Sequence, residues 1–183
     1  MFIQYYTMNY SDSDELFPVV DEEGNEISIA TRSVCHDGKS RLLHPVVHLH
    51  LFNSKGELFL QKRAMTKDLL PGYWDTSAGG HVSHGESIEE ALKREVEEEL
   101  GLSDIKYEFK IKYIWESQTE RELVYSFAGR SDNNPVINKD EIDDGRFWLF
   151  TEIEENLGKG VFTPNFVFEF RMLFITSLNT IFS

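Results

Sequence analysis

The stretch GHVSHGESIEEALKREVEEELGL, residues 80 to 102, decides the fold of this chain. Seven of its 23 residues are glutamate, and only two are basic. On a helical wheel Glu95, Glu98 and Glu99 lie at positions i, i+3 and i+4, so they share one face. Like charges at this spacing destabilise a helix by roughly 0.2–0.5 kcal/mol per pair. Either the face is simply solvated, as most charge runs are, or it holds a divalent cation such as Mg²⁺, which prefers carboxylate oxygens.

Residues 87–100 form the clearest predicted helix of the chain. Ser87 is suited to be its N-cap, and Glu90 three residues later completes a capping box. Gly101 is a typical C-terminal stop. One apolar face repeats at four-residue spacing, formed by Ile88, Leu92, Val96 and Leu100. The acidic face therefore belongs to an amphipathic helix whose other side packs on a core.

The same stretch matches the pattern G-x5-E-x7-R-E-U-x-E-E-x-G-U, where U is an apolar residue, at every position. The matching residues are Gly80, Glu86, Arg94, Glu95, Val96, Glu98, Glu99, Gly101 and Leu102. With average residue usage, such a match arises by chance on the order of once in a hundred million placements. This pattern is the Nudix box, and the chain resembles the Nudix hydrolase family.

The resemblance implies the hydrolysis of a nucleoside diphosphate linked to another moiety, with Mg²⁺ or Mn²⁺ as the cofactor. It assigns Glu98, Glu99 and the backbone carbonyl of Gly79 as metal ligands. Glu95 would be a further ligand or the general base that deprotonates water. The cation would act as a Lewis acid on the phosphoryl group.

Two further expectations come with the box. Glu86 and Arg94 would pair and hold the preceding loop against the helix. Family members often recruit one more acid from a later loop, and Glu141 in the segment NKDEIDD is a candidate. Its alternative is an ordinary solvated loop carboxylate.

The residues before the box narrow the branch of the family. The segment LFNSKGELFLQKRAMTKDLLPGYWDTSAGGH, residues 51–81, resembles isopentenyl diphosphate isomerases and the Nudix hydrolases most similar to them. By this resemblance, Arg63 and Lys67 would bind the diphosphate of the substrate. Otherwise they are ordinary charges at a strand end and in a loop.

The isomerase resemblance also implies a second metal site of three histidines and two glutamates. His44, His81, Glu120 and Glu122 occupy four of its positions, and His36 is the fifth if the loop 37–43 carries one extra residue. Zn²⁺, Mn²⁺ and Mg²⁺ all tolerate such a mixture of ligands. Each histidine taken alone could instead be a hydrogen-bonded loop or core residue. The alternating His48 and His50 are expected to be packing residues on a strand.

One departure favours hydrolysis over isomerisation. The isomerase needs a cysteine where this chain has Gly79, and the only cysteine, Cys35, lies outside the motif. Without that thiol, proton transfer on an allylic substrate lacks an acid–base partner. The intact glutamates of the box point the same way. A third alternative is a phosphate-ligand sensor of the same fold without turnover, although a sensor needs no water-activating face.

Composition sets the remaining expectations. The chain has 183 residues, of which 40% are hydrophobic and 13% aromatic, and this predicts one folded domain over residues 16–183 after a polar tail, residues 1–15. The net charge of −14 without a basic stripe argues against nucleic acid or a membrane surface as a partner. A single cysteine and the lack of a signal peptide or an apolar span suggest the cytoplasm. A homodimer is expected by family analogy alone.

The predicted fold is α/β: a Nudix-type α/β/α sandwich with a mixed β-sheet, an N-terminal β-hairpin extension and a C-terminal helix. Alternating apolar residues and turn signals predict the strands 16–20, 26–30, 45–52, 58–63, 105–117, 121–130 and 146–150. Residues 45–52 and 58–63 are expected to pair as a hairpin. Thr151 would cap a short helix over 152–157, and Thr163 followed by Pro164 would open the last helix.

Overall fold

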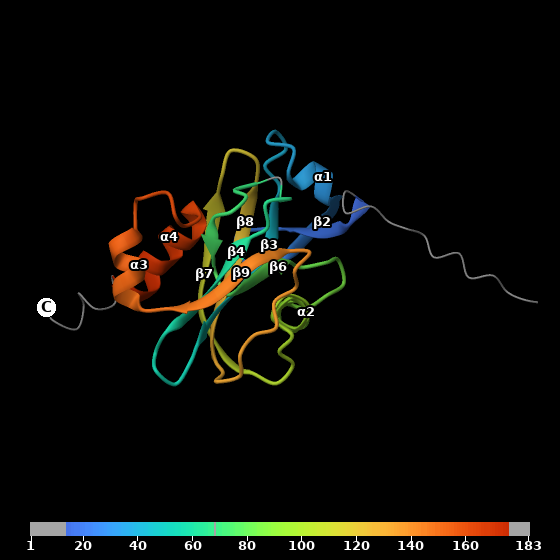
Figure 1. Ribbon diagram of the computed structural model, residues 1–183. Helices are drawn as coiled ribbons and strands as arrows, with labels where there is room; N and C mark the ends of the chain where they lie inside the picture. The colour runs from blue at the N-terminus through green and yellow to red at the C-terminus, as the bar shows by residue number, and fades with distance from the viewer. Residues whose placement is uncertain (1–13, 68, 176–183) are drawn as a thin grey trace, which may run out of the picture.

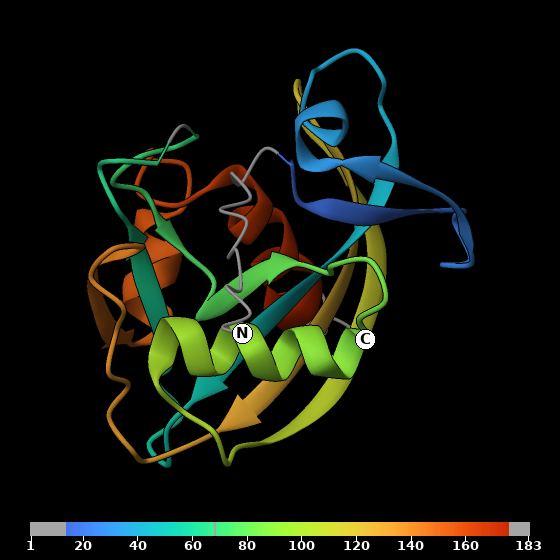
Figure 2. The ribbon, with the colours of Figure 1, turned by 90° about the vertical axis from the view of Figure 1, so that its right-hand side faces the viewer.

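The computed structural model describes residues 14–67 and 69–175, arranged as a mixed β-sheet between helices (Figure 1). Helix α2 covers one face of the sheet, and α3 and α4 cover the other (Figures 1 and 2). This arrangement confirms the predicted α/β/α sandwich. Within the described part of the chain, no helix combines the length and apolarity needed to cross a membrane.

The N-terminal extension is the predicted hairpin. Strand β1 (Leu16–Val20) pairs antiparallel with β2 (Glu26–Thr31). A single helical turn, α1 (Arg32–Cys35), follows β2 directly. Residues 1–13 of the predicted tail lie outside the described residues, whereas the carbonyl of Glu15 accepts the backbone N–H of Arg32.

Seven strands form the main sheet: β3 (Leu43–Phe52), β4 (Leu58–Arg63), β5 (Trp74–Asp75), β6 (Ala78–His81), β7 (Lys106–Glu116), β8 (Arg121–Arg130) and β9 (Ile142–Trp148). The order is β5-β4-β3-β8-β7, with β6 paired to β3 and β9 paired to β4. The pair β3–β8 is parallel and the others are antiparallel, so the sheet is mixed. The predicted β7–β8 hairpin is confirmed.

The predicted hairpin of β3 and β4 is confirmed but short. The two strands pair antiparallel only at Phe52 and Leu58, and farther from the turn β3 pairs with β6 and β4 pairs with β9. The predicted start of the last strand is wrong. Strand β9 begins at Ile142, four residues earlier than predicted. Its exposed Asp143 and Asp144 suggested a loop, yet Asp144 lies opposite Lys62 of β4.

Helix α2 (Ile88–Leu100) has the predicted caps. The Ser87 hydroxyl accepts from the backbone N–H of Glu90, whose carboxylate accepts from the N–H of Ser87. Gly101 ends the helix with φ 63°, a left-handed conformation that glycine adopts without strain. Residues on the apolar face of α2 pack against Val47, Leu49 and Leu51 of β3 in one buried cluster, namely Ala91, Leu92, Val96 and Leu100. This packing fixes the acidic face of α2 relative to β6, with which α2 is in contact.

The second core lies between the sheet and the C-terminal helices. It is built from apolar residues of β4, β9, α3, α4 and the loop before α4, namely Leu58, Leu60, Trp148, Ile153, Phe162, Phe166 and Phe170. Helix α4 (Pro164–Phe170) begins as predicted, because the Thr163 hydroxyl accepts from the N–H of Phe166, and a π-helical turn (Arg171–Ile175) continues it.

Helix α3 (Phe150–Asn156) corrects the expected cap. Thr151 lies inside the helix, and the N-cap position is Leu149. The carboxylate of Glu152 accepts the backbone N–H of Leu149, so this side chain satisfies the helix start in place of a threonine hydroxyl.

Candidate active site

Glu99 is the most buried carboxylate of the box helix. It is 8% exposed, and its Oε2 accepts from the backbone N–H of Gly79 and from Nε2 of Gln61, both at 3.0 Å. Burial raises the pKa of Glu99 to about 8, and the charge of Glu95 adds to the shift. A cation at this carboxylate would compensate the buried negative charge, so the donor chemistry fits a hard metal ion.

Arg94 organises the remaining carboxylates of the helix. It binds Glu86 with two hydrogen bonds, Nε to Oε1 at 2.9 Å and Nη2 to Oε2 at 3.0 Å. Its Nη1 also donates to Glu95 at 2.7 Å and to Glu98 at 3.3 Å. The hydrogen bonds to Glu86 are the main cause that raises the pKa of Arg94. The Glu86–Arg94 ion pair is thus formed, and the same guanidinium partly neutralises two of the three glutamates.

Glu95 is held between Arg94 and β6. Burial raises its pKa, while the charge and hydrogen bond of Arg94 oppose this shift. A Cβ atom at Gly80 would overlap the Glu95 carboxylate, so the glycine of the box leaves room for this side chain. Gly80 therefore allows the backbone of β6 to lie close to the acidic face of α2.

Glu141, the candidate acid from a later loop, and the predicted phosphate-binding residues Arg63 and Lys67 lie in two different places. Lys67 pairs with Glu141 at 2.6 Å, and the negative charge of Glu141 acts on both Glu95 and Glu99. Arg63 instead pairs with Asp75 at 3.3 Å. Burial raises the pKa of Glu120 and, together with the charge of Glu120, raises that of Glu122 to about 8, while the positive charge of Arg63 opposes the shift of both glutamates. Lys67 therefore borders the acidic site, and Arg63 lies toward the histidines.

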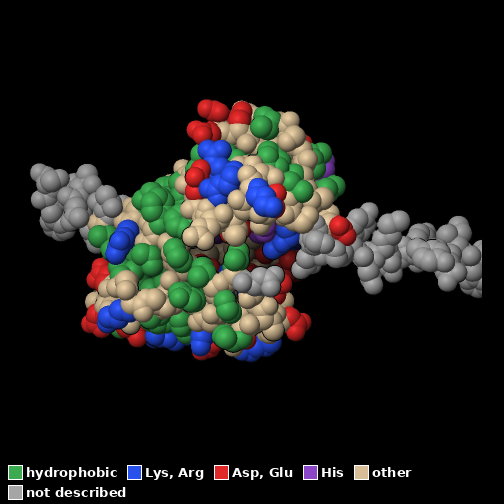
Figure 3. Space-filling view, turned by 90° about the horizontal axis from the view of Figure 1, so that it is seen from above, with side chains coloured by type: hydrophobic (Ala, Val, Ile, Leu, Met, Phe, Trp, Pro, Cys, Tyr) green, Lys and Arg blue, Asp and Glu red, His purple; other side chains and the backbone are tan. Residues whose placement is uncertain are grey.

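All five residues of the predicted second metal site come together. Two groups of side chains share His81, and the possible ligand atoms within each group lie within 4.8 Å of one another: His36, His44 and His81, and His81, Glu120 and Glu122. Among the described residues, no other group of three or more His, Cys, Asp or Glu side chains has its possible ligand atoms this close together. The box glutamates Glu95, Glu98 and Glu99 therefore lie farther apart than this limit. The five residues come from the C-cap of α1, the start of β3, the end of β6 and the β7–β8 hairpin. Seen from above, histidine atoms lie at a hollow beside Lys and Arg side chains (Figure 3).

The protonation of these histidines suits a metal. Nδ1 of His44 lies 3.0 Å from the carbonyl of Leu42 and donates to it, so Nε2 carries the lone pair; this buried atom has no partner among the described residues. Nε2 of His36 lies 3.0 Å from Nε2 of His81. Burial, together with His44 and Arg32, lowers the pKa of His36 to about 4, and burial also lowers the pKa of His81 well below its usual value. Neutral imidazoles with converging lone pairs fit Zn²⁺ or Mn²⁺.

The prediction that His48 and His50 are packing residues is wrong. Both face α4 and bracket Glu169, which is fully buried. Nδ1 of His48 lies 2.8 Å from Oε2 of Glu169, and Nε2 of His50 lies 3.1 Å from Oε1. Burial alone would lower the pKa of His48, but the charge of Glu169 outweighs it and raises that pKa to about 9. The sequence signals for this cluster were two histidines at alternate positions of a strand and a glutamate in an otherwise apolar helix.

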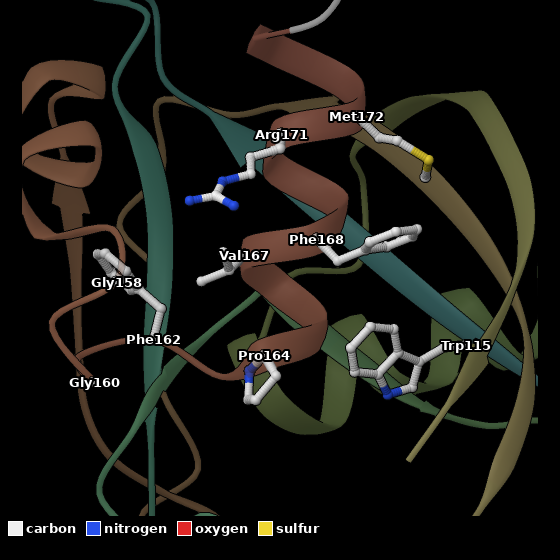
Figure 4. Close-up of a pocket in the computed structure, with 9 residues that line it drawn as sticks. All are labelled: Trp115, Gly158, Gly160, Phe162, Pro164, Val167, Phe168, Arg171 and Met172. Atoms are coloured by element: carbon white, nitrogen blue, oxygen red, sulfur yellow. The ribbon is translucent and has the colours of Figure 1, made fainter.

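A groove of about 500 Å³ lies along the outer side of α4 (Figure 4). Trp115 and Phe168 line one part of it, and Phe162 and Val167 another. Its lining contains no histidine, aspartate or glutamate. The His and Glu side chains that could bind a metal therefore lie near β6 and not in this groove.

Comparisons with known proteins agree with this architecture. The family model described as NUDIX domain matches residues 42–166. The chain is 35% identical over 136 residues to isopentenyl-diphosphate Delta-isomerase 2 of Photorhabdus laumondii, covering 72% of this chain and 75% of the relative. It is 36% identical over 135 residues to an uncharacterised Nudix hydrolase of Listeria monocytogenes, covering 68% and 74%.

Solved structures show the same fold. A Deinococcus radiodurans protein superposes with a TM-score of 0.75 at 25% identity and covers 87% of this chain and 99% of its own. A MutT protein of Methanosarcina mazei superposes with a TM-score of 0.63 at 23% identity, covering 74% and 95%. The chain belongs to the Nudix family of pyrophosphohydrolases, enzymes that act on diphosphate substrates and generally use divalent metal ions.

Proposed function

We propose that the acidic site on α2 hydrolyses a diphosphate linkage in a nucleoside diphosphate derivative or a related organic diphosphate. The observation that carries this proposal is the complete acidic face beside β6. Glu99 is buried against the N–H of Gly79, while Glu95 and Glu98 are held by Arg94. A sequence that had lost the reaction would not need to keep three mutually repelling carboxylates in this place.

Glu98, Glu99 and the carbonyl of Gly79 would hold Mg²⁺ or Mn²⁺. When bound, the cation would polarise the phosphoryl group and make a water molecule more acidic. Arg94 positions Glu98 through its hydrogen bond at 3.3 Å and is itself fixed by Glu86. Lys67 and Arg63 would bind the diphosphate, Lys67 from the side of Glu141 and Arg63 from the side of Asp75.

Glu95 is the proposed general base. Burial raises its pKa above the usual value of a glutamate, and a carboxylate with a raised pKa is the stronger base. Glu95 takes a proton from water, the water oxygen bonds to phosphorus, and the bond from phosphorus to the bridging oxygen breaks. The bridging oxygen leaves with one phosphate and gains the proton. The products are two phosphate compounds whose atoms together equal the substrate plus one water.

A second candidate function is isopentenyl diphosphate isomerisation. The convergence of His36, His44, His81, Glu120 and Glu122 favours it, and we propose these residues as a second metal site. Gly79 argues against it, because no thiol is available there, and Cys35 is buried elsewhere. Hydrolysis remains the better supported function.

The test is a substrate screen with Mg²⁺ and with Mn²⁺, covering nucleotide sugars, dinucleotide cofactors, nucleoside di- and triphosphates, and isopentenyl diphosphate. Phosphate release and product mass are followed for each compound. Hydrolysis of one class would support the proposal. Rearranged isopentenyl diphosphate without phosphate release would replace it with the isomerase function, and binding without any turnover would favour a sensor. The single domain over 16–183, the cytoplasmic location and the homodimer stay predictions.

A further inference from the structure

We propose that Gln61 is a positioning residue of the acidic site. It fixes the carboxylate of Glu99 so that a single oxygen faces the cation, and it thereby selects Mg²⁺ or Mn²⁺ over Ca²⁺. The inference rests on the proposed function only for the presence of a divalent cation at Glu99. Gln61 lies on β4, outside the box motif of residues 80–102.

The first observation is that Gln61 occupies a core-facing position of its strand. Phe59, two residues earlier, belongs to the buried cluster that includes the apolar face of α2, and side chains two positions apart on a strand point to the same face. Gln61 is itself 7% exposed. A buried amide costs free energy unless it is hydrogen-bonded, and the Nε2 of this amide donates to Oε2 of Glu99 at 3.0 Å. An apolar side chain would meet the packing needs of this position, so the amide is explained by its carboxylate partner.

The second observation is that the two oxygens of Glu99 are not equivalent. Oε2 accepts two hydrogen bonds, from the backbone N–H of Gly79 and from Gln61, both at 3.0 Å. Oε1 has no hydrogen-bond partner among the described residues, so it is the oxygen available to a cation. Gln61 and Gly79 together make Glu99 a ligand that offers one oxygen in a fixed direction.

Glu99 is also the more rigid of the two proposed glutamate ligands. The side chain of Glu98 is 56% exposed and contacts Arg94 at 3.3 Å. Glu99 is 8% exposed and is held by donors from two different strands, β4 and β6. A ligand whose orientation is fixed before binding determines where the ion lies, because the other ligands can adjust to it.

The number of available oxygens affects the choice of metal. Mg²⁺ is small, demands octahedral geometry at about 2.0–2.1 Å and is satisfied by one oxygen from each carboxylate. Ca²⁺ takes roughly 6–8 oxygens at about 2.3–2.6 Å and often uses both oxygens of a carboxylate. The hydrogen bond from Gln61 occupies the second oxygen of Glu99. It therefore disfavours Ca²⁺, whereas Mg²⁺ and Mn²⁺ lose nothing.

The test is metal binding to the full-length chain without substrate. Mn²⁺ titration is followed by the EPR signal of the free ion, and Mg²⁺ and Ca²⁺ compete for the bound Mn²⁺. Binding that is lost in Glu99→Gln belongs to the acidic site. Gln61→Met keeps a similar side-chain volume and removes the amide. It should lower the ratio of the Mn²⁺ affinity to the Ca²⁺ affinity about 10-fold, the change that corresponds to one hydrogen bond to a charged group.

A second variant and a control keep the result interpretable. Gln61→Asn keeps an amide that is one methylene too short to reach Glu99, and it should cause the same fall in the ratio. It replaces Gln61→Met if that variant does not fold, which urea unfolding shows. Asn156→Leu removes a different amide hydrogen bond, to the carbonyl of Glu152 on α3, and should leave the ratio unchanged. An unchanged ratio in a folded Gln61 variant, or an equal fall in the control, would overturn the inference.

Failure of the proposed function gives a different result. A chain whose Gln61 variants show the fall in the ratio, but which hydrolyses no diphosphate, would retain the role of Gln61 and lose the hydrolase proposal. A chain that hydrolyses a diphosphate, with the same metal preference in the variants, would retain hydrolysis and lose the role of Gln61. A chain that binds no Mn²⁺ through Glu99 would lose both.

Discussion

Two candidate sites use the same short strand, β6, and differ in how their charge is balanced. The acidic site draws on one continuous stretch, and a single guanidinium, that of Arg94, contacts Glu86, Glu95 and Glu98. The histidine site collects His36, His44 and His81 from three separate elements. Its imidazoles are neutral because burial lowers their pKa values.

This difference in charge and ligand type predicts which metal ion each site would prefer. The acidic site offers hard oxygen ligands and gains mainly from charge neutralisation, which suits Mg²⁺ or Mn²⁺. The histidine site offers nitrogen lone pairs, among them the unpartnered Nε2 of His44, and gains mainly from ligation. The two sites should therefore respond differently to substitution, to pH and to the choice of metal.

The largest effect is expected from Glu98→Gln in the acidic site. It removes one proposed ligand, so turnover should fall on the order of 1000-fold and Mn²⁺ should bind more weakly. Steady-state kinetics and Mn²⁺ titration measure this. Glu97→Gln, an exposed neighbour on the same helix, is the matched control and should keep full activity. Unchanged turnover in Glu98→Gln would contradict the metal assignment.

Glu95→Gln should separate rate from metal binding within the same site. A lost general base costs about 100-fold or more in rate, whereas the ligands Glu98 and Glu99 remain. The measurement is the turnover number beside the Mn²⁺ dissociation constant. Equal losses in both would show that Glu95 is a ligand and not the base.

Glu169→Gln should act on stability, because Glu169 is a proposed ligand of neither metal site. Removing one partner of a buried ion pair costs roughly 3–5 kcal/mol, measured as the free energy of unfolding in urea. Glu155→Gln, exposed on α3, is the control.

The stability effect should depend on pH with a definite sign. The folded pKa of His48, about 9, lies above its unfolded value near 6.5. Its contribution is therefore complete below about pH 6.5 and is lost as the pH rises toward 9. His48 and His50 hold the pKa of Glu169 below its usual range against the opposing effect of burial, so its contribution is lost as the pH falls below about 4.5. A difference between wild type and Glu169→Gln that stays constant from pH 6 to 9 would contradict this coupling.

The smallest effect on hydrolysis is expected from the pair His44→Ala and His81→Ala. It should remove one metal equivalent per chain while the acidic site keeps its own. Elemental analysis after dialysis against Zn²⁺ or Mn²⁺ measures the stoichiometry. His84→Ala, exposed beside Glu26, is the control. Unaltered metal stoichiometry would contradict the proposal of a second metal site. A large loss of turnover would show that the two sites act as one functional site.

Local rules predicted the elements whose signals lie within a few residues. The cap of α2 at Ser87 and the start of α4 at Thr163 follow from side chains that bond the adjacent backbone, and the end of α2 at Gly101 follows from the left-handed conformation of this glycine. The cap of α3 was missed because Glu152, and not Thr151, satisfies the helix start. Strand β9 was shortened because its two aspartates are exposed, and only the pairing with β4 makes that segment a strand.

The sequence by itself determined the family, the box helix and the identity of its acidic residues, because a fixed spacing on one helix fixes which side chains share a face. Tertiary structure decided what those residues meet. It placed Glu99 under β6, directed Lys67 and Arg63 to different partners, and joined His36 to the distant Glu120. It also turned His48 and His50 into partners of Glu169, more than a hundred residues away. Such contacts depend on sheet order and packing, which no local pattern of residues encodes.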